Sequence, residues 1–500
     1  MEKYLSDNLY LNHRKNSLIN GKMIVRVLGV LLCIEAVMFL VCSGISLCYA
    51  ESDYRYFLYT FLINVGVGGV MLLYGRNAEN HLNRRDGYCI VSLAWVLFTL
   101  FGMMPFYLSG SIPSITDAFF ETMSGFTTTG ATILNNIESL SHGMLFWRSL
   151  TQWIGGLGIV FFTIAILPIF TSGGVQLFSA ESTGVTHDKT HPKTNVMAKW
   201  LWTVYLVLTV SEVILLCLGK MDLFDAVCQS FSTTATGGFS TKQDSISYWN
   251  STYIEYVIAI FMLLSGINFS LFFLCGKGRF TKLFKDEELR WFLSSVAILT
   301  GLVTVGLILV NHYDVELAFR KALFQVATSH TSCGFATDDY NLWPSYTWLL
   351  LIFAMISGGC TGSTSGGVKS MRFLIVARSI RNEFKRLLHP NAVLPVRVNK
   401  QTVSPTILTT VSGFFIFYLF FIFLGWTVLL SLNVGFSESL STVVSCLGGV
   451  GPGLGSFGPA YSWAALPDAA KWVLSFLMLI GRLELFCVLL LFYPGFWKSR

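Results

Sequence analysis

Long apolar stretches recur along this chain and are separated by shorter polar segments. Many of them approach the ~20 residues that an α-helix needs to cross a bilayer. We expect crossings near residues 24–49, 56–75, 88–109, 147–170, 197–218, 253–275, 291–311, 347–372, 404–430 and 471–493. No soluble core needs so many long apolar runs. The pattern therefore predicts an all-α polytopic membrane protein.

Four shorter segments, each lying between two of these crossings, repeat a single pattern. They align without a gap on the glycines Gly130, Gly238, Gly334 and Gly451. Six residues before each glycine stands a hydroxyl residue, namely Ser124, Ser232, Thr328 and Ser445. Repetition at this scale indicates one structural unit that is used four times.

The stretch before each glycine is partly apolar and too short to span a bilayer, which is typical of a re-entrant half-helix. We therefore expect four pseudo-repeated units of helix, pore helix, loop and helix around one pore, preceded by two extra transmembrane helices. Irregular backbone at membrane depth is tolerated only inside protein or against water, so the four loops should face one another. The predicted divisions are an N-terminal segment 1–86 and pore units 87–172, 195–276, 288–385 and 402–500.

Composition and charge agree with a membrane location and indicate the orientation. The chain is 53% hydrophobic and 12% charged, whereas soluble domains carry about 25% charged residues. Basic residues gather in alternate loops, at 76–85, 189–199 and 372–400, and loops of the other set carry Asp53 and Asp222. The positive-inside rule then places both termini and the basic loops in the cytoplasm. The net charge of +6 is a topology signal and no nucleic-acid signature.

The four glycine loops carry the candidate chemistry. Glycine adopts positive φ and so turns its carbonyl group toward an axis, and rings of such carbonyls replace the hydration shell of a monovalent cation. The predicted filter comprises Thr128, Thr129, Gly130, Gly237, Gly238, Cys333, Gly334, Val450 and Gly451. Either Gly237 or Gly238 could be the axial residue of the second loop, and the upstream register favours Gly238. Asp338 and Asp339, just beyond Gly334, are expected to concentrate cations at the outer mouth.

The eighth apolar run is interrupted by small and polar residues over 357–367. Such a stretch is a poor lipid-facing helix, so it should unwind inside the protein, across the pore below the filter. We interpret it as a gating loop that moves aside, with the candidate residues Gly358, Gly359, Gly362, Ser363, Gly366 and Gly367. The alternative is a kinked helix that packs tightly through small residues.

Two charged residues, Arg482 and Glu484, lie within the last apolar run. Charge inside a membrane is costly and usually faces a cavity or a partner. We expect Arg482 to stand in the pore below the filter, as a barrier or as an anchor for the broken loop. Residues two apart on a helix do not face each other, so the alternative is a structural pairing with other neighbours.

Enzyme signatures fail on their spacing. Residues 362–370 are similar to a nucleotide-binding phosphate loop, but Val368 separates Gly367 from Lys369 and breaks the required ending. A hydrolase nucleophile such as Ser365 would need a base, and His330 belongs to a filter segment on the other side. The sequence therefore predicts neither an enzyme nor a covalently bound cofactor.

Several motifs together resemble the TrkH branch of the Trk/Ktr/HKT potassium transporter superfamily. They are Phe-Thr-Thr-Thr-Gly-Ala at 126–131, Trp-Arg-Ser-Leu-Thr-Gln-Trp-Ile-Gly-Gly at 147–156, Thr-Gly-Gly-Phe-Ser at 236–240, Gly-Ser-Thr-Ser-Gly-Gly at 362–367, Gly-Val-Gly-Pro-Gly at 449–453 and Gly-Arg-Leu-Glu at 481–484. The resemblance covers nearly the whole chain. The two extra crossings favour this branch over the shorter KtrB branch.

The resemblance implies potassium uptake across the bacterial inner membrane, with K⁺ held by backbone carbonyls of the filter, a gate at 357–367 and a pore charge at Arg482. It implies a homodimer in membrane lipid, and a cytoplasmic TrkA-like ring that binds the controlling nucleotide. Some plant relatives that pass sodium better have a serine in place of the first filter glycine, so Gly130 favours potassium. The competing hypothesis is a carrier that couples potassium to protons or sodium. Coupling to protons normally needs a titratable mid-membrane relay, for which Glu484 is the main candidate.

Overall fold

The computed structural model describes residues 19–79, 82–170, 194–276, 278 and 280–498. Part of the basic loop predicted at 189–199 lies outside these residues. The helices are α2 (Gly21–Cys48), α3 (Tyr54–Tyr74), α4 (Arg84–Gly102), α5 (Met104–Leu108), α6 (Ile115–Phe126), α7 (His142–Phe170), α9 (Thr194–Leu218), α10 (Leu223–Ala235), α11 (Thr252–Ser265), α12 (Phe269–Gly276), α13 (Phe280–Lys285), α14 (Glu287–Leu309), α15 (Val315–His330), α16 (Ser345–Ser357), α17 (Ser370–Leu388), α18 (Pro405–Ser431), α19 (Phe436–Gly448), α20 (Asp468–Arg482), α21 (Phe486–Phe492) and α22 (Pro494–Trp497). Short 3₁₀ turns lie at Ile137–Ser139, Ser245–Trp249, Tyr340–Leu342 and Gly455–Phe457, and β1 (Arg397–Val398) pairs antiparallel with β2 (Gln401–Thr402).

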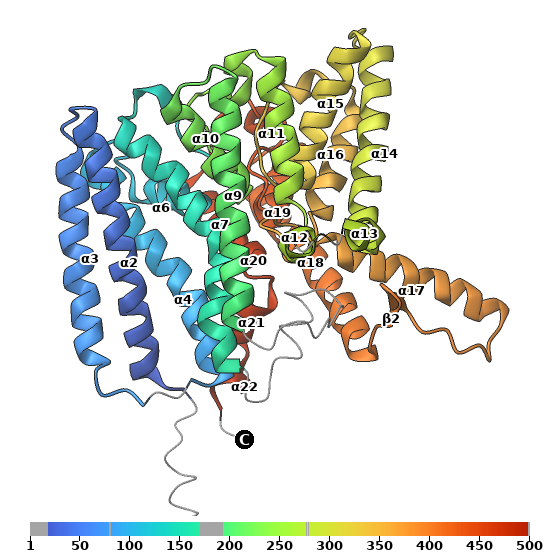
Figure 1. Cartoon of the computed structure of the whole chain (residues 1–500), viewed down its shortest axis with the longest axis horizontal. Coiled ribbons are helices and arrows are strands. Elements are labelled where there is room, and N and C mark those ends of the chain that lie inside the picture. The colour runs from blue at the N-terminus through green and yellow to red at the C-terminus, as the bar shows by residue number, and fades with distance from the viewer. Residues whose placement is uncertain (1–18, 80–81, 171–193, 277, 279, 499–500) are drawn as a thin grey trace, which may run out of the picture.

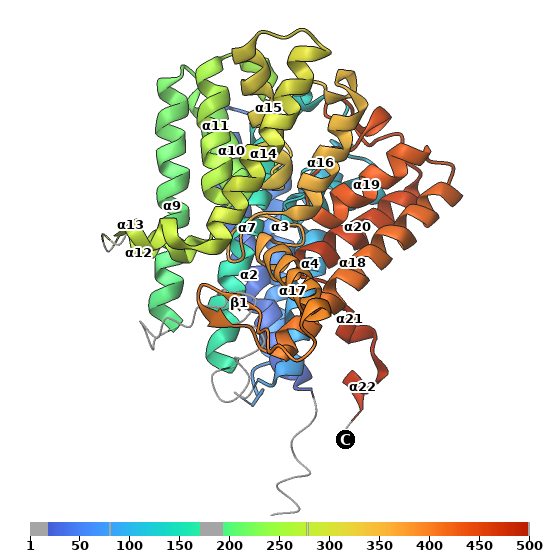
Figure 2. The ribbon, with the colours of Figure 1, turned by 90° about the vertical axis from the view of Figure 1, so that its right-hand side faces the viewer.

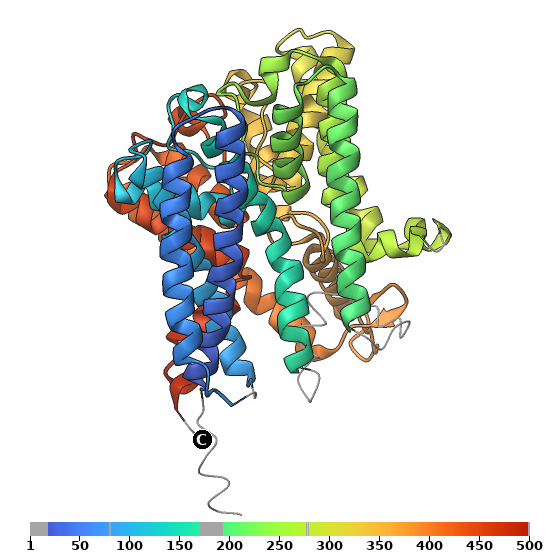
Figure 3. The ribbon, with the colours of Figure 1, turned by 60° about the vertical axis from the view of Figure 1, so that its left-hand side comes forward.

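Helices α2 and α3 form an antiparallel pair at one edge of the molecule (Figure 1, Figure 3). Their backbones approach closely at Gly29, where a Cβ would come closer than 3.0 Å to the carbonyl oxygen of Gly68. Such contacts through small residues are typical of membrane helices. Between them, the buried Glu35 accepts a hydrogen bond from Asn64 at 3.3 Å. These are the two helices that the sequence places before the repeated units.

Each repeated unit contains a short pore helix, and these four helices are α6, α10, α15 and α19. They are 12, 13, 16 and 13 residues long, which is too short to cross a bilayer. Side chains determine where two of them begin, because Ser114 accepts the amide of Asp117 and Asp222 accepts the amide of Phe224. The half-helices predicted before the glycines are therefore present in all four units.

Two of the expected crossings are bent. Within the described residues, six helices are long and apolar enough to cross a membrane, or eight if each bent pair counts as one span. Helices α11 and α12 meet at 96°, and α20 and α21 meet at 116°. Asn268 caps the new helix after the first break by accepting the amide of Ser270, and positive φ at Glu484 and Leu485 ends the helix at the second. The apolar pattern continues through both breaks, so it did not reveal them.

The eighth apolar run is interrupted as predicted, because α16 ends at Ser357 and α17 begins at Ser370. Helix α17 then leaves the bundle at a steep angle to its neighbours (Figure 1). Helices α12 and α13 project sideways from the body in the same way (Figure 2). The described chain is almost entirely helical, with its long helices packed side by side, which confirms the predicted fold class.

Candidate cation filter and gate

The four aligned glycines share one unusual backbone conformation. Their φ angles are +84° at Gly130, +80° at Gly238, +96° at Gly334 and +102° at Gly451. The residue two positions earlier also has positive φ in every loop, namely Thr128, Thr236, Ser332 and Gly449. Alternation of positive and negative φ turns successive carbonyl oxygens to the same side of the backbone, which suits a filter built from carbonyl rings.

The four loops close into a ring. A Cβ on each filter glycine would come closer than 3.0 Å to the carbonyl oxygen that precedes the glycine of the next loop. The order is cyclic, with Gly130 against Gly237, Gly238 against Cys333, Gly334 against Val450, and Gly451 against Thr129. Each pore helix packs in the same order against the outgoing helix of the preceding unit: α10 on α7, α15 on α11, α19 on α16 and α6 on α20. The sequence repeat is thus a pseudo-fourfold arrangement about one axis.

The hydroxyl residues six positions upstream of the glycines hold the loops to their pore helices. The backbone carbonyl of Ser124 accepts the amide of Thr129 at 2.8 Å. Equivalent bonds join Ser232 to Gly237, Thr328 to Cys333 and Ser445 to Val450, at 2.8, 2.8 and 2.9 Å. These bonds use carbonyl groups that the end of a helix leaves unpaired, so each loop starts from the same geometry.

The structure also decides which glycine of the second loop is equivalent to the others. Gly238 has positive φ, whereas Gly237 does not. The amide of Gly237, and not that of Gly238, bonds to Ser232 in the equivalent position. Gly238 therefore matches the other three glycines in backbone conformation, as the register of the upstream residues predicts. In the third loop the buried Cys333 directs its Sγ toward the carbonyl of Ser232, 4.0 Å away.

An open depression lies on one side of the ring and is lined by all four filter glycines. Its wall includes Arg148 and Lys242 but, in the described part of the chain, neither Asp338 nor Asp339. Asp338 instead accepts a hydrogen bond from the Tyr313 hydroxyl at 3.3 Å, and burial together with this carboxylate raises the pKa of Tyr313. The carboxylates of Asp338 and Asp339 bond within the loops on either side of α15, so their concentration of cations at the mouth stays a prediction.

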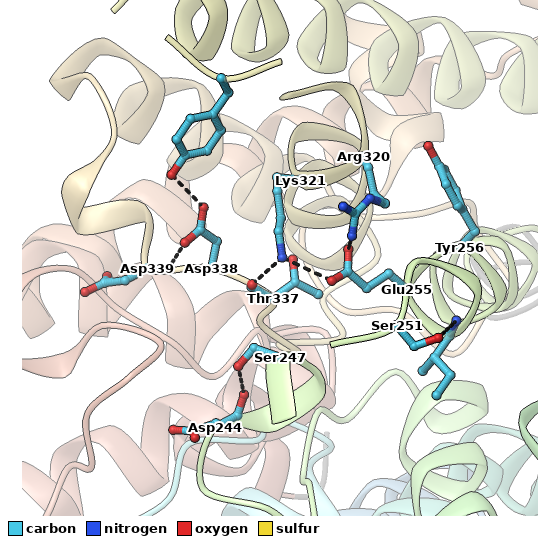
Figure 4. Close-up of polar contacts among 12 residues, drawn as sticks. Asp244, Ser247, Ser251, Glu255, Tyr256, Arg320, Lys321, Thr337, Asp338 and Asp339 are labelled. Carbon is cyan, nitrogen blue, oxygen red and sulfur yellow. Dashed lines mark hydrogen bonds and ion pairs between the residues drawn. The ribbon is translucent and has the colours of Figure 1, made fainter. Parts of the chain in front are cut away.

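A charged cluster joins the second and third units beside the filter (Figure 4). Glu255 of α11 is 2% exposed and pairs with two cations of the pore helix α15, Arg320 at 2.6 Å and Lys321 at 3.1 Å. Lys321 also donates to the backbone carbonyl of Thr337 at 2.7 Å. Because Thr337 follows Gly334 by three residues, the cluster ties the outgoing limb of the third filter loop to two helices.

Charged pairs also support the first pore helix, α6. Arg148 of α7 pairs with the buried Glu121 at 2.9 Å and donates to the carbonyl of Ser240, in the second loop, at 3.0 Å. Lys471 of α20 pairs with Asp117 at 2.6 Å. These contacts link the first unit to the second and to the fourth, so charged pairs hold neighbouring units of the ring together.

The gating-loop candidates form an irregular segment against the filter. Gly366 donates its amide to Ser332, and a Cβ on Gly366 would come closer than 3.0 Å to the carbonyl of Gly448. Thr364 donates to the carbonyl of Thr234 at 3.0 Å. Positive φ recurs at three of the glycines, Gly358, Gly362 and Gly367. The segment thus contacts the second, third and fourth units at once, in a conformation that no helix could adopt.

Ser365 organises the interior of this segment. Its hydroxyl accepts the amide of Gly359 at 3.1 Å and lies 2.8 Å from the hydroxyl of Ser363. Its carbonyl accepts a hydrogen bond from the buried Lys369. The serine is therefore a structural centre of the loop.

Arg482 lies at the end of α20 and anchors the loop. Its Nη1 donates to the carbonyl of Thr364 and its Nη2 to the carbonyl of Gly155, each at 2.8 Å. Glu484 does not share this contact and pairs with Arg372 at 2.6 Å. Of the roles considered from the sequence, the contacts fit an anchor for the broken loop.

Sequence reasoning missed three residues that hold the filter or the loop: Gln152, Glu288 and Lys321. Gln152 bonds to the second filter loop, and both oxygens of Glu288 accept hydrogen bonds from Thr361, at 2.6 and 2.9 Å. Each is a polar residue in or beside a membrane-embedded helix. For Gln152, which lies inside an apolar run, this setting is a signal that could have identified it. Glu288 and Lys321 stand beside other charged residues, Glu287 and Arg320, so their local sequence does not distinguish them.

A sequence profile of the TrkH family, described as a cation transport protein, matches residues 55–498. The chain is 39% identical over 482 residues to the Trk system potassium uptake protein TrkH of Salmonella typhimurium, a match that covers 96% of this chain and 99% of the relative. It is 38% identical over 482 residues to the protein of the same name from Escherichia coli K12, with the same coverage.

A solved structure agrees with these sequences. The crystal structure of the potassium transporter TrkH from Vibrio parahaemolyticus is similar to this one with a TM-score of 0.86 and 35% sequence identity. The match covers 95% of this chain and 99% of that chain. Since profile, relatives and structure agree over almost the full length, the chain belongs to the TrkH family of cation transport proteins.

Proposed function

We propose that this chain is a transport protein, not an enzyme, that takes up potassium across the bacterial inner membrane through a selective pore. The observation that carries the proposal is the closed ring of four glycines with positive φ. Such a backbone offers carbonyl oxygens in place of the hydration shell of an ion. Relatives that match nearly the full chain are named potassium uptake proteins, which supports K⁺ as that ion.

In this proposal, K⁺ is coordinated by the backbone carbonyls of the predicted filter residues. The segment 357–367 is the gate, and Arg482 holds it closed through Thr364. The division of the chain into a segment 1–86 and four pore units stays a prediction, supported by the matching pore helices.

The assembly follows from the family resemblance. The relatives are named as members of a Trk system, which supports a complex of several components. We propose a homodimer in the inner membrane with both termini in the cytoplasm, and a TrkA-like cytoplasmic ring that carries the nucleotide. The basic segment 372–400 is a candidate docking region for that ring, although attraction to anionic lipid accounts for its charge nearly as well.

A coupled carrier is the second candidate function. Two carboxyl groups, Glu35 on α2 and Glu212 on α9, are buried within membrane-embedded helices. Buried acids at such depth form proton relays in pumps and transporters. A carrier of this class would move potassium against its own gradient when a proton or sodium gradient is applied.

The test is cation flux in proteoliposomes that hold this chain alone, with K⁺, Rb⁺, Na⁺ and Li⁺ compared. We expect K⁺ and Rb⁺ to pass well above Na⁺ and Li⁺, and the flux to reverse with the ion gradient alone. Equal flux of all four ions would overturn the selective filter. Dependence of direction on a second ion would favour the carrier.

A further inference from the structure

Gln152 of α7 reaches from the first unit into the second filter loop. Its side-chain Nε2 donates to the carbonyl oxygen of Gly237 at 2.7 Å, and its Oε1 accepts the amide of Phe239 at 3.0 Å. The side chain is fully buried. One amide group therefore brackets the filter glycine Gly238 from both sides along the chain.

The packing around Gly237 is shaped by this glutamine. A Cβ on Gly237 would come closer than 3.0 Å to Cδ, Oε1 and Cγ of Gln152. Gly237 does not need glycine for its φ angle, which is not positive. Space for Gln152 is thus the reason for a glycine at this position.

The neighbouring turn of α7 grips the same loop. Arg148, four residues before Gln152 and so on the same helix face, donates to the carbonyl of Ser240 at 3.0 Å and lies over the Phe239 ring at 4.1 Å. One face of α7 therefore contacts the second loop at three residues, 237, 239 and 240. This is a built contact between two units.

The contact of Gln152 with the second filter loop has no counterpart at the equivalent helix positions of the other units. Ten residues after the start of the outgoing helix, where α7 has Gln152, helices α11, α16 and α20 have Met262, Met355 and Met478, which are apolar. Four carbonyl groups directly precede the filter glycines. Within the described part of the chain, only the carbonyl of Gly237 accepts a hydrogen bond from a side chain. The ring is therefore chemically asymmetric.

We propose that Gln152 is a positioning residue that sets the ion preference of the filter through the Gly237 carbonyl. A carbonyl oxygen has two lone pairs, so it can accept from Gln152 and still face an ion. The donated bond restricts the orientation of the oxygen. Ion selectivity depends on the number and field strength of the coordinating carbonyls, so a carbonyl freed from Gln152 coordinates Na⁺ and Li⁺ more readily. This inference rests on the proposed function.

The test compares relative permeabilities of K⁺, Rb⁺, Na⁺ and Li⁺ in proteoliposomes for the full chain and Gln152→Met, which keeps the volume but removes both bonds. We expect the K⁺ to Na⁺ ratio to fall by about fivefold, the effect of losing the one hydrogen bond to the Gly237 carbonyl, with little change in K⁺ flux. Gln229→Met is the matched control, because Gln229 is equally buried but bonds to the Ser240 hydroxyl at 2.7 Å and not to the filter backbone. An unchanged ratio in folded Gln152→Met, or an equal fall in Gln229→Met, overturns the inference.

Gly237→Ala keeps the test decisive if Gln152→Met does not fold. Alanine there displaces the glutamine without backbone strain, and we expect the same fall in the K⁺ to Na⁺ ratio. Where all variants fold, the double variant should be no worse than either single one, since both act through one contact. A wild-type ratio in Gly237→Ala, or additive losses, overturns the inference. A non-selective wild-type chain would instead refute the proposed function itself.

Discussion

Arg482 donates a hydrogen bond to the backbone carbonyl of Thr364 at 2.8 Å, and this contact ties the last repeated unit to the loop that lies against the filter. The same guanidinium group donates to Gly155 of the first unit, also at 2.8 Å. The loop therefore cannot move aside without breaking a charge-assisted hydrogen bond. Under the proposed gating role of this loop, Arg482 is an anchor that a substitution can remove.

Replacing Arg482 by alanine should raise the potassium flux. Each hydrogen bond to a charged group is worth ~1.5–3 kcal/mol, so the loss of the bond to Thr364 should raise the open fraction by about tenfold or more. Shortening 357–367 should act in the same direction. Single-channel recording or proteoliposome flux measures both changes.

The control for this change is Arg386→Ala, because Arg386 pairs with Glu383 on the exposed part of α17, far from the filter loops. It should leave the flux unchanged. If folded Arg482→Ala protein gave the same flux as the wild type, the hypothesis that Arg482 restrains the loop would be contradicted.

Gly130→Ser should weaken the discrimination against sodium. The φ of +84° is strained for serine, and a Cβ would press on the carbonyl oxygen of Gly237. The ratio of K⁺ to Na⁺ permeability measures the effect, and we expect it to fall by about tenfold, since distortion at such a site costs ~1–3 kcal/mol. Gly110→Ser is the control, because Gly110 has a φ of +73° but nothing within 4 Å of a Cβ. Loss of selectivity in that control would point to general misfolding.

Lys321→Met should destabilise the protein and loosen the third filter loop. It leaves Glu255, which is 2% exposed, with one cation instead of two and frees the carbonyl of Thr337. Breaking a buried ion pair costs ~3–5 kcal/mol. The cost here should be smaller, because Arg320 still pairs with Glu255. We expect a lower melting temperature and a lower K⁺ to Na⁺ ratio. Glu316→Gln is the control, because Glu316 is an exposed partner of Arg320; a similar loss there would contradict the special role of the cluster.

Glu288→Ala should release the start of the gating loop and raise the flux. Both carboxylate oxygens accept hydrogen bonds from Thr361, and alanine leaves the amide of that residue without this partner. An unsatisfied buried group costs ~1–3 kcal/mol, so an increase of about five- to tenfold is expected in the same flux assay. Glu287→Ala is the matched control, because Glu287 bonds to Arg378 and Asn399 and not to the loop. Equal effects of the two changes would show that the N-terminal end of α14 acts as a whole.

The sequence by itself determined the membrane class, the fourfold repeat, the pore helices and the interrupted eighth run. These features are local, because the length of an apolar run, the spacing of aligned glycines and the poor helix propensity of 357–367 are properties of neighbouring residues. The equivalence of Gly238 to the other three glycines also followed, since its register is counted along the chain.

Only the tertiary structure decided which distant groups meet. It bent α11–α12 and α20–α21 within runs that stay apolar, turned Asp338 toward Tyr313, and placed Gln152 against Gly237 across a unit boundary. Each of these contacts joins residues from separate elements, and its geometry depends on how helices from different units pack. A periodic pattern along the chain does not identify the hydrogen-bond partner of a single polar side chain. That partner often lies far away in the sequence and is brought close only by folding.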